Sequence, residues 1–387
     1  MGDTGIFVGT AADDKARSEK YIVRGKLGEG AFGDVRHGTD RTTGSKVALK
    51  FIRVLNKSGG LPRAVFRELE ALRQLGAGRH IVKLLDVFPD ETQLCLVLEY
   101  LDSDLSEVIG QAQAPLPVAH IKAYSHMLLE ALAYVHSKRI IHRDIKPSNI
   151  LLSAAGVLKL ADFGLSRVIG TGTDPAEHGV ARGTPVGSST QDLSHQVATR
   201  WYRPPELLFA SRSYTFSADI WSAGAVVAEL FALRPLFPGS NDIDQMFRVF
   251  QIMGNPTPEN WPGVELLPDF NKVCFSALRP ISLSLLIPRL GPRDVQFLES
   301  LLALDPAKRC TASDACNADY FHTQPLPSDH FLLPCSSRTK PAAPASGAGA
   351  RGTSGSSGAP GDGSMEVVLA EWEKENKRIA QLLAPIH

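Results

Sequence analysis

The sequence predicts an α+β fold in which a small strand-rich half precedes a larger helical half. Residues 21–99 contain short β-rich runs separated by Gly, Asp, Thr and Pro turns. After Pro117, apolar residues recur at helical spacing as far as about Phe321. A chain of 387 residues is long enough for two or three units with their own cores. We therefore expect the two halves to cover about 21–101 and 102–321.

One helix is expected among the strands of the first half. The segment 62–75 begins with a proline in its first turn, and its apolar residues recur at helical spacing. A long helix is expected after Pro117, with a buried face marked by Ile121, Tyr124, Leu128, Ala131, Leu132 and Val135. The most apolar window, 223–233, contains Glu229 and is too short to span a bilayer, so it indicates a buried core helix.

Other segments lack these patterns. Residues 1–20 are polar and aperiodic, which favours a flexible N-terminal tail. Residues 170–191 are rich in Gly, Thr, Ser and Pro and are expected to form an inserted loop. We place a low-complexity linker over 322–364. The final segment, 365–387, regains helical periodicity and is interpreted as an amphipathic helix, with a solvated tail as the alternative.

Composition excludes several classes of protein. Lys plus Arg and Asp plus Glu each number 41, so no overall field attracts nucleic acid or an anionic membrane. The five cysteines are scattered without a CxxC spacing, which argues against a disulfide framework or a zinc site. The N-terminal residues carry no apolar run of the kind found in secretory signals. We expect an intracellular protein without nucleic-acid or membrane partners.

A glycine-rich stretch, GEGAFGDV, carries Gly28, Gly30 and Gly33 in the GxGxxG spacing. Glycines let backbone amides approach phosphate oxygens closely. The dinucleotide-binding turn of an oxidoreductase has the same spacing, but it must lead from a strand into a helix. Here a second strand pattern with a Thr-Gly turn follows, so the stretch fits a β-hairpin instead.

Lys50 ends the alternating strand VALK. A lysine beside phosphates acts as a point charge and needs a carboxylate to hold it. Glu68 is the candidate, because helical spacing places it on the same face as Val65. Glu70 is the alternative, although it better fits a surface position.

Two polar motifs follow apolar runs. HRDIKPSN (142–149) lies between two apolar stretches, where polar groups are costly unless they have partners or a role. ADFGLSR (161–167) follows VLKLA, and its Asp162 could ligate a divalent metal together with Asn149.

The chain thus reads, in order, glycine loop, strand lysine, helix glutamate, HRDxKxxN, DFG and PPE at 204–206. This order resembles the eukaryotic protein kinase family over residues 21 to about 321. The resemblance implies a bilobal protein kinase fold, with an N-lobe of about 21–101 and a C-lobe of about 102–321. It also implies an activation segment over 162–206 and transfer of phosphate from Mg-ATP to Ser or Thr.

The same resemblance assigns roles to residues. Asp144 would accept the proton of the substrate hydroxyl, Lys146 would neutralise charge on the phosphoryl group, and Lys50 with Glu68 would complete the catalytic set. Asn149 and Asp162 would hold Mg²⁺. Nucleotide binding is assigned to Leu27, Gly28, Glu29, Gly30, Ala31, Phe32, Gly33, Asp34, Val35, Ala48, Lys50, Glu99, Leu101, Asp104, Asn149, Leu151 and Asp162.

Later motifs imply structural support for this site. DIWSAG resembles the segment whose aspartate, Asp219 here, braces the catalytic loop, HRDIKPSN (142–149) here, from a buried helix. A carboxylate near a helix N-terminus is also favoured by the macrodipole. LDPAKRCTASDA resembles the segment whose arginine, Arg309 here, pairs with Glu206.

Within the family, the chain resembles the cyclin-dependent kinases. PRAVFRE is similar to their cyclin-contacting helix, and VATRWYRPPELL and PLFPGSNDIDQMFRVFQIMGNPTPENWP follow their pattern. The resemblance extends to a subgroup associated with cilia and flagellar length control. It implies a cyclin or cyclin-like activator bound through 62–75, protein substrates with Ser/Thr-Pro sites, and a cytoplasmic, nuclear or ciliary location. Mitogen-activated kinases are the rival, but STQDLSHQ lacks their Thr-x-Tyr pair.

The chain departs from its family at regulatory positions. The Thr-Tyr pair of the glycine loop is Ala31-Phe32, and Ser194 replaces the usual activating threonine. An upstream kinase is expected to phosphorylate Ser194, and the phosphate is expected to gather three arginines, namely Arg67, Arg143 and Arg167. A competing site is Thr184 in the insertion. The alternative of a pseudokinase scaffold is disfavoured, because the strand lysine and both aspartates are present.

Overall fold

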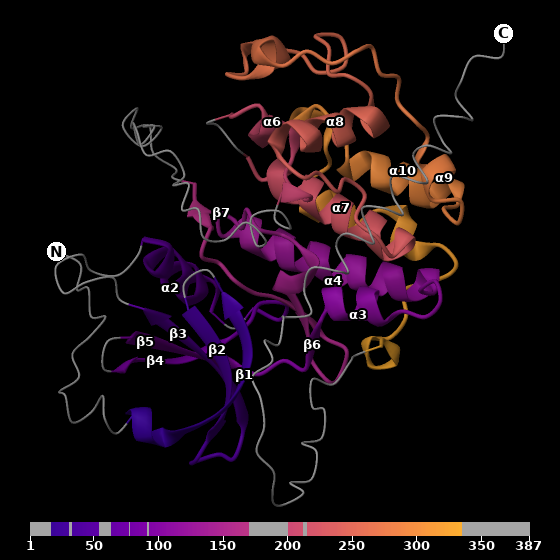
Figure 1. Cartoon of the computed structure of the whole chain (residues 1–387). Helices are drawn as coiled ribbons and strands as arrows, with labels where there is room; N and C mark the ends of the chain where they lie inside the picture. Colours follow the sequence, from indigo (N-terminus) through magenta and orange to yellow (C-terminus); the bar gives the residue numbers. More distant parts are fainter. Residues whose placement is uncertain are drawn as a thin grey trace, which may run out of the picture. The chain divides into compact units, whose positions relative to one another are not determined.

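The computed structural model describes residues 17–30, 33–53, 63–76, 78–90, 93–169, 200–211 and 215–334. All of them belong to Met1–Arg338, the first of two units into which the chain divides. Figure 1 shows the indigo strands with α2 as one half of this unit and the magenta-to-orange helices as the other. The predicted insertion 170–191 and the predicted C-terminal helix 365–387 lie outside the described residues.

The strand-rich half is one antiparallel sheet. Its strands run in the order β1-β2-β3-β5-β4. Their bounds are β1 Tyr21–Gly30, β2 Gly33–Asp40, β3 Lys46–Arg53, β4 Leu84–Asp90 and β5 Gln93–Glu99. The predicted helix is α2, Arg63–Leu75. Its apolar face packs on the sheet through Val65 and Leu69, which join Ile52, Leu94 and Leu96 in one buried cluster.

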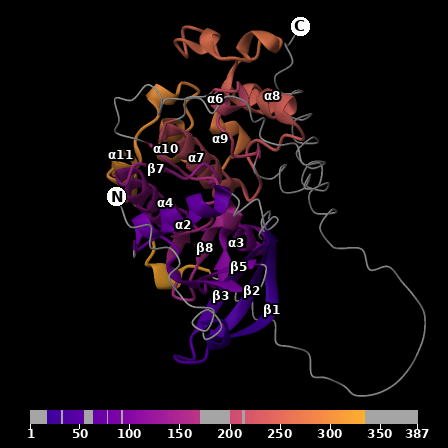
Figure 2. The same ribbon diagram turned by 90° about the vertical axis from the view of Figure 1, so that its left-hand side faces the viewer.

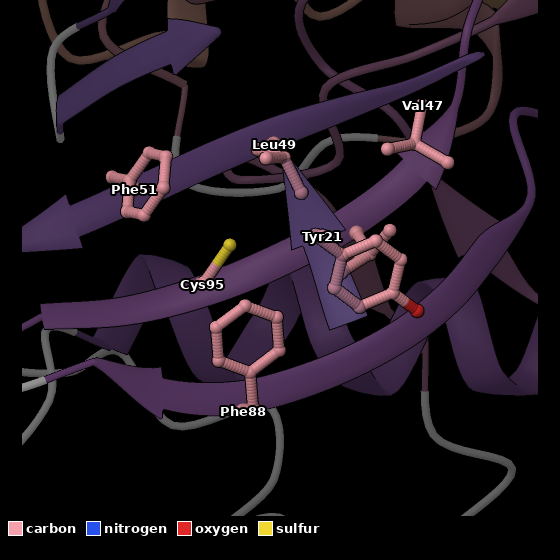
Figure 3. Close-up of a cluster of buried hydrophobic side chains, with 7 residues drawn as sticks. Tyr21, Val47, Leu49, Phe51, Phe88 and Cys95 are labelled. Atoms are coloured by element: carbon pink, nitrogen blue, oxygen red, sulfur yellow. The ribbon is translucent and has the colours of Figure 1, made fainter. Parts of the chain in front are cut away.

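Alternation along β3 decides where Lys50 lies. Successive side chains of a strand point to opposite faces of the sheet. Leu49 and Phe51 belong to a cluster on one side, together with Tyr21, Val47, Phe88, Cys95 and Val97 (Figure 3). Ile52 joins the cluster beneath α2. Lys50, two residues before Ile52, therefore faces α2.

The helical half is built around two buried helices. The longer elements are α3 Leu105–Gln111, α4 Val118–Ser137, α7 Ser217–Ala232, α8 Asp242–Met253 and α10 Pro292–Leu301. The short helices are α6 Pro205–Leu208, α9 Leu283–Leu286 and α11 Ala312–Cys316. Figure 1 shows α4 and α7 side by side, and Figure 2 shows the helices above the strands from another direction. Both helices lie where apolar periodicity predicted them.

Short strands and turns join the helices. A three-stranded sheet consists of β6 Ser103–Asp104, β8 Ile150–Leu152 and β9 Leu158–Leu160, and a two-stranded one of β7 Ile140–Ile141 and β10 Arg167–Val168. The 3₁₀ turns are η1 Pro147–Asn149, η2 Val264–Leu266, η3 Phe270–Lys272, η4 Pro306–Lys308, η5 Asp319–His322 and η6 His330–Leu332. Among the described helices, none is both long enough and apolar enough to cross a bilayer.

The structure corrects two segment boundaries. Residues 17–20 are helical, although a loose tail was expected as far as residue 20. The linker expected from residue 322 also begins later, because the chain stays packed as far as Pro334. The Tyr124 hydroxyl donates to the Pro334 carbonyl at 2.7 Å, and His330 Nδ1 lies 2.7 Å from the Ala155 carbonyl. A Pro- and Ser-rich segment without periodicity gives no sign of such contacts.

Candidate active site

The glycine-rich stretch forms the predicted hairpin. Gly28 pairs with Val35 and Gly30 with Gly33, so β1 turns directly into β2. A Cβ at Gly33 would lie 1.7 Å from the Phe51 carbonyl oxygen, which excludes every other residue there. A Cβ at Gly28 would meet nothing within 4 Å, so its backbone borders open space. This hairpin fits a phosphate group held by backbone amides. Ala31 and Phe32 lie outside the described residues.

Lys50 connects the two lobes. Its Nζ lies 2.7 and 2.8 Å from the two carboxylate oxygens of Glu68 and 3.2 Å from Asp162 Oδ1. Glu68 is only 2% exposed and binds Lys50, whereas Glu70 is exposed, as the helical spacing predicted. Burial by itself would lower the pKa of Lys50, but Glu68 and Asp162 outweigh it and raise that pKa. Lys50 is therefore a fixed positive charge beside the glycine hairpin.

The two carboxylate oxygens of Asp144 differ in their hydrogen bonds. Its Oδ2 accepts hydrogen bonds from Lys146 Nζ at 2.9 Å and from Asn149 Nδ2 at 2.8 Å. Its Oδ1 is buried and has no hydrogen-bond partner among the described residues. A buried acceptor without a partner costs free energy, which a substrate hydroxyl would relieve. The free oxygen can therefore take the proton of an incoming hydroxyl.

Asp219 on α7 holds the backbone of the catalytic loop through hydrogen bonds. Its carboxylate accepts the backbone amides of His142 and Arg143, each at 2.8 Å, and lies 2.9 Å from His136 Nε2. Arg143 has a φ of 71°, a strained left-handed conformation that such bonds can hold in place. Burial opposes the charge of Asp219, but His136 and the amide bonds outweigh it and keep the pKa of Asp219 below its usual value.

His142 ties the catalytic loop to the DFG motif. Its Nε2 lies 3.0 Å from the Ala161 carbonyl, which can only accept, so this nitrogen carries the proton. Its Nδ1 accepts the Asp144 amide at 3.2 Å. The ring also meets Phe163 edge-on, with centroids 4.7 Å apart. The catalytic base and the metal-binding aspartate are thus built on connected segments.

Asp162 and Asn149 fit a magnesium site. Asn149 Nδ2 donates to the Asp144 carbonyl and carboxylate, both at 2.8 Å, which leaves its oxygen as a ligand. Burial opposes the charge of Asp162, but Lys50 outweighs it and keeps the pKa of Asp162 below its usual value. The described residues hold no group of three or more His, Cys, Asp or Glu that could bind a metal alone. Mg²⁺ does not need one, since it commonly takes one or two protein oxygens together with phosphate oxygens.

The segment joining the lobes contains other predicted nucleotide contacts. Glu99 Oε1 accepts Lys159 Nζ at 2.6 Å and the Lys83 amide at 2.7 Å, so this side chain fixes the end of β5. Leu101 is buried, and Asp104 caps α3 by accepting the Glu107 amide at 3.0 Å. Ala48 pairs with Leu98, and Leu151 pairs with Asp104. Glu99, Leu101 and Asp104 thus lie between the end of β5 and the start of α3, whereas Ala48 lies on β3 and Leu151 on β8.

Sequence reasoning missed two polar residues that support the site. Lys159 holds Glu99, and His136 holds Asp219. Lys159 is buried inside the apolar run VLKLA, and a lysine at a buried strand position was the available signal. Nothing in the local pattern marks His136, because its partner lies 83 positions away in the chain.

Only part of the predicted phosphate-binding group lies within the described residues. Arg67 on α2 and Arg167 on β10 are exposed, and Arg143 is partly buried. Ser194 lies outside the described residues, so its role stays a prediction. The expected pairing of Arg309 with Glu206 is formed by two bonds of 2.8 Å.

The site is built for phosphoryl transfer, with a hairpin for phosphates, a fixed lysine and a free base. Residues 21–321 match the family model described as the protein kinase domain, and the chain belongs to the protein kinase family. Cyclin-dependent kinase 20 from Danio rerio is 41% identical over 320 residues, which cover 83% of this chain and 88% of that protein. Cyclin-dependent kinase 7 from Xenopus laevis is 38% identical over 325 residues, 83% of this chain and 87% of that protein.

A solved structure agrees with these relatives. A chain in the structure of the CAK complex from Chaetomium thermophilum bound to ATP-gamma-S has a TM-score of 0.72 and 38% identity to this chain. The match covers 84% of this chain and 98% of that one. The predicted bilobal α+β fold is confirmed, and the chain is an ATP-using serine/threonine kinase of the cyclin-dependent type. The expected resemblance to one subgroup within that branch is also confirmed, since cyclin-dependent kinase 20 is among these relatives. The pseudokinase alternative receives no support.

Proposed function

We propose that this kinase phosphorylates Ser or Thr followed by proline in protein substrates, under the control of a cyclin-like activator. The observation that carries the chemistry is the buried Oδ1 of Asp144, which has no partner among the described residues. Bound Mg-ATP supplies the phosphoryl group and the metal charge. Lys50 fixes the phosphates, Asp144 orients and deprotonates the hydroxyl, and Lys146 screens the developing charge.

Two substitutions separate these roles. Asp144→Asn keeps the shape of the loop but removes the base, so kcat should fall roughly a hundredfold or more while ATP binding survives. Asp162→Asn should instead lose magnesium-dependent nucleotide binding, because it removes a charged metal ligand. Steady-state kinetics and nucleotide titrations with and without Mg²⁺ measure the two effects. Near-normal turnover of Asp144→Asn would refute the assignment of the base.

The proline preference rests on the segment TRWYRPPE, whose residues from Arg200 onward are described. Proline lacks an amide hydrogen, so a pocket without an acceptor for that hydrogen favours it. Peptides that differ only in Pro or Ala after the acceptor test this directly. Equal kcat/KM for the two would rule the preference out.

The cyclin-like activator is proposed to bind α2. This helix carries Phe66, which is 47% exposed, next to the exposed Arg67 and the buried Glu68. The similarity to cyclin-dependent kinases and to a chain of the CAK complex supports such a partner. A bound partner would hold α2 in the position in which Glu68 meets Lys50. Full-length protein assayed alone and with a panel of cyclins tests this, with Phe66→Ala as the variant that should lose any stimulation.

We propose that activation also uses phosphate at Ser194. An added phosphate brings about −1.5 to −2 charges and can bind several arginines. Ser194→Ala should lower activity strongly, whereas Thr184→Ala should not. Phosphate mapping by mass spectrometry on the active protein checks both. Full activity of Ser194→Ala would contradict the proposal.

The cellular role is proposed from the resemblance alone. A part in the cell cycle or in cilium and flagellum length control would place the protein in the cytoplasm, nucleus or cilium. Imaging of the tagged full-length chain, together with measurement of cilium length after its removal, tests this. Unchanged cilium length would contradict the ciliary part.

A further inference from the structure

Two arginines near the catalytic loop share one carboxylate. Arg200 Nε donates to Asp242 Oδ1 at 2.6 Å, and Arg203 Nη1 reaches the same oxygen at 3.4 Å. The Arg200 side chain is 15% exposed and that of Arg203 35%, while Asp242, at the start of α8, is 55% exposed. Asp242 therefore joins both ends of the segment 200–203 to the start of α8.

The residues between the arginines point into the protein. The Trp201 indole donates to the Gly239 carbonyl at 3.0 Å, and the Tyr202 hydroxyl donates to Glu229 on α7 at 2.7 Å. The Tyr202 carbonyl accepts the Ser222 hydroxyl at 2.7 Å. These bonds fix the backbone independently of Asp242. Losing the Asp242 carboxylate would leave the segment in place, free Arg203 of this contact and leave Arg200 with its longer bond, 3.4 Å, from Nη1 to the Ser240 carbonyl.

Arg203 lies within electrostatic reach of the catalytic base. Burial lowers the pKa of Arg203, and both Asp242 and Asp144 oppose that effect, while Arg200 adds to it. Geometry gives the same placement, because Asp219 of α7 holds the backbone of His142 and Arg143, and Ser222, one turn later on α7, holds the Tyr202 carbonyl beside Arg203. Two guanidinium groups with a single carboxylate carry a net positive charge, and without that carboxylate they would form an anion site.

We propose that Asp242 is a specificity-determining residue. By engaging Arg200 and Arg203, it prevents this segment from selecting an acidic or phosphorylated residue directly after the phosphoacceptor. The inference rests on the proposed function, since it concerns the residue that the proposed preference assigns to proline. Asp242 acts through the arginines and does not touch the reacting atoms.

Asp244 provides a matched control on the same helix turn. Both aspartates lie in the first turn of α8 and interact alike with its macrodipole. Asp244 binds the Ser240 amide at 2.8 Å and Arg248 at 3.0 Å, neither of which belongs to the segment 200–203. A general effect on α8 would appear in both variants, whereas the proposed effect appears only in Asp242→Asn.

The test compares full-length wild type, Asp242→Asn, Asp242→Glu and Asp244→Asn on peptides with Pro, Ala or Asp after the acceptor serine. The measure is the ratio of kcat/KM for Ser-Asp to that for Ser-Ala, which does not depend on the active fraction of enzyme. In Asp242→Asn this ratio should rise about tenfold, the size of one charge-assisted hydrogen bond. Asp242→Glu and Asp244→Asn should keep the wild-type ratio, and KM for ATP should stay unchanged in all variants.

Two results would overturn the inference. One is an unchanged Ser-Asp to Ser-Ala ratio in folded Asp242→Asn, and the other is an equal rise in Asp244→Asn. If wild type showed no preference for Ser-Pro over Ser-Ala, the proposed proline preference would fail instead. The Asp242 comparison would still be decided, because it does not use the proline peptide.

Discussion

The buried ion pair between Arg309 and Glu206 allows a quantitative stability prediction. The Arg309 side chain has no exposed surface, and that of Glu206 is 5% exposed. All five guanidinium hydrogens have acceptors: two on Glu206 and one each on the carbonyls of Ala303, Leu304 and Ser217. Glu206→Gln keeps the size of the side chain but leaves the buried charge of Arg309 uncompensated.

Removing one partner of a buried pair costs about 3–5 kcal/mol. In a domain of this size, that cost lowers Tm by roughly 5–15 °C. Arg309→Met should lower the free energy of unfolding by a similar amount, because it leaves the carboxylate of Glu206 and three backbone carbonyls without their hydrogen-bond donor. The double variant Glu206→Gln/Arg309→Met should lose less than the sum of the two, since it leaves no isolated charge.

Thermal unfolding monitored by fluorescence measures all four proteins under one buffer and scan rate. A Tm of Glu206→Gln within a degree of wild type would refute the argument that the charge is uncompensated. Strictly additive losses in the double variant would refute the argument that the two side chains act as a pair.

Three further outcomes are expected. Gly156→Ala should lower Tm, because φ is +73° there and the new Cβ would lie 1.7 Å from the His330 carbonyl oxygen. A Tm equal to that of wild type would contradict this close contact. Burial raises the pKa of Glu229 from 4.5 to about 7, so the folded state binds its proton more tightly and stability should fall as pH rises between these values. Glu229→Gln should flatten that pH dependence of Tm, and an unchanged slope would exclude Glu229 as its source. Deleting 336–387 should leave Tm nearly unchanged, because the last described contact is made at residue 334; insolubility of the truncated chain would contradict this.

Periodic patterns in the sequence predicted the elements that place the site. The helical spacing of 62–75 identified both the helix and the inward direction of Glu68. Apolar spacing likewise located α4 and α7, whose buried faces are wide and continuous. Such patterns report which face of an element is buried, because burial repeats with the period of the element.

Polar contacts between distant residues could not be predicted in this way. The bonds of Asp242 to Arg200 join residues 42 positions apart, and those of Tyr124 to Pro334 span 210 positions. No local period encodes a single hydrogen bond of this kind. The motif resemblance supplied the pairing of Arg309 with Glu206, whereas contacts outside the recognised motifs, such as Lys159 with Glu99, required coordinates.

Helix α7 holds the catalytic loop and the segment 200–203 through separate side chains. Near its N-terminus, Asp219 holds the backbone of the catalytic loop; further along, Ser222 and Glu229 hold Tyr202. All three side chains are buried, so water cannot replace their hydrogen bonds when the kinase binds or releases a peptide. Helix α7 therefore determines how the catalytic loop and the segment 200–203 lie relative to each other. On this frame, the proposed role of Asp242, at the start of α8, is exerted through its bonds to Arg200 and Arg203 in the same segment.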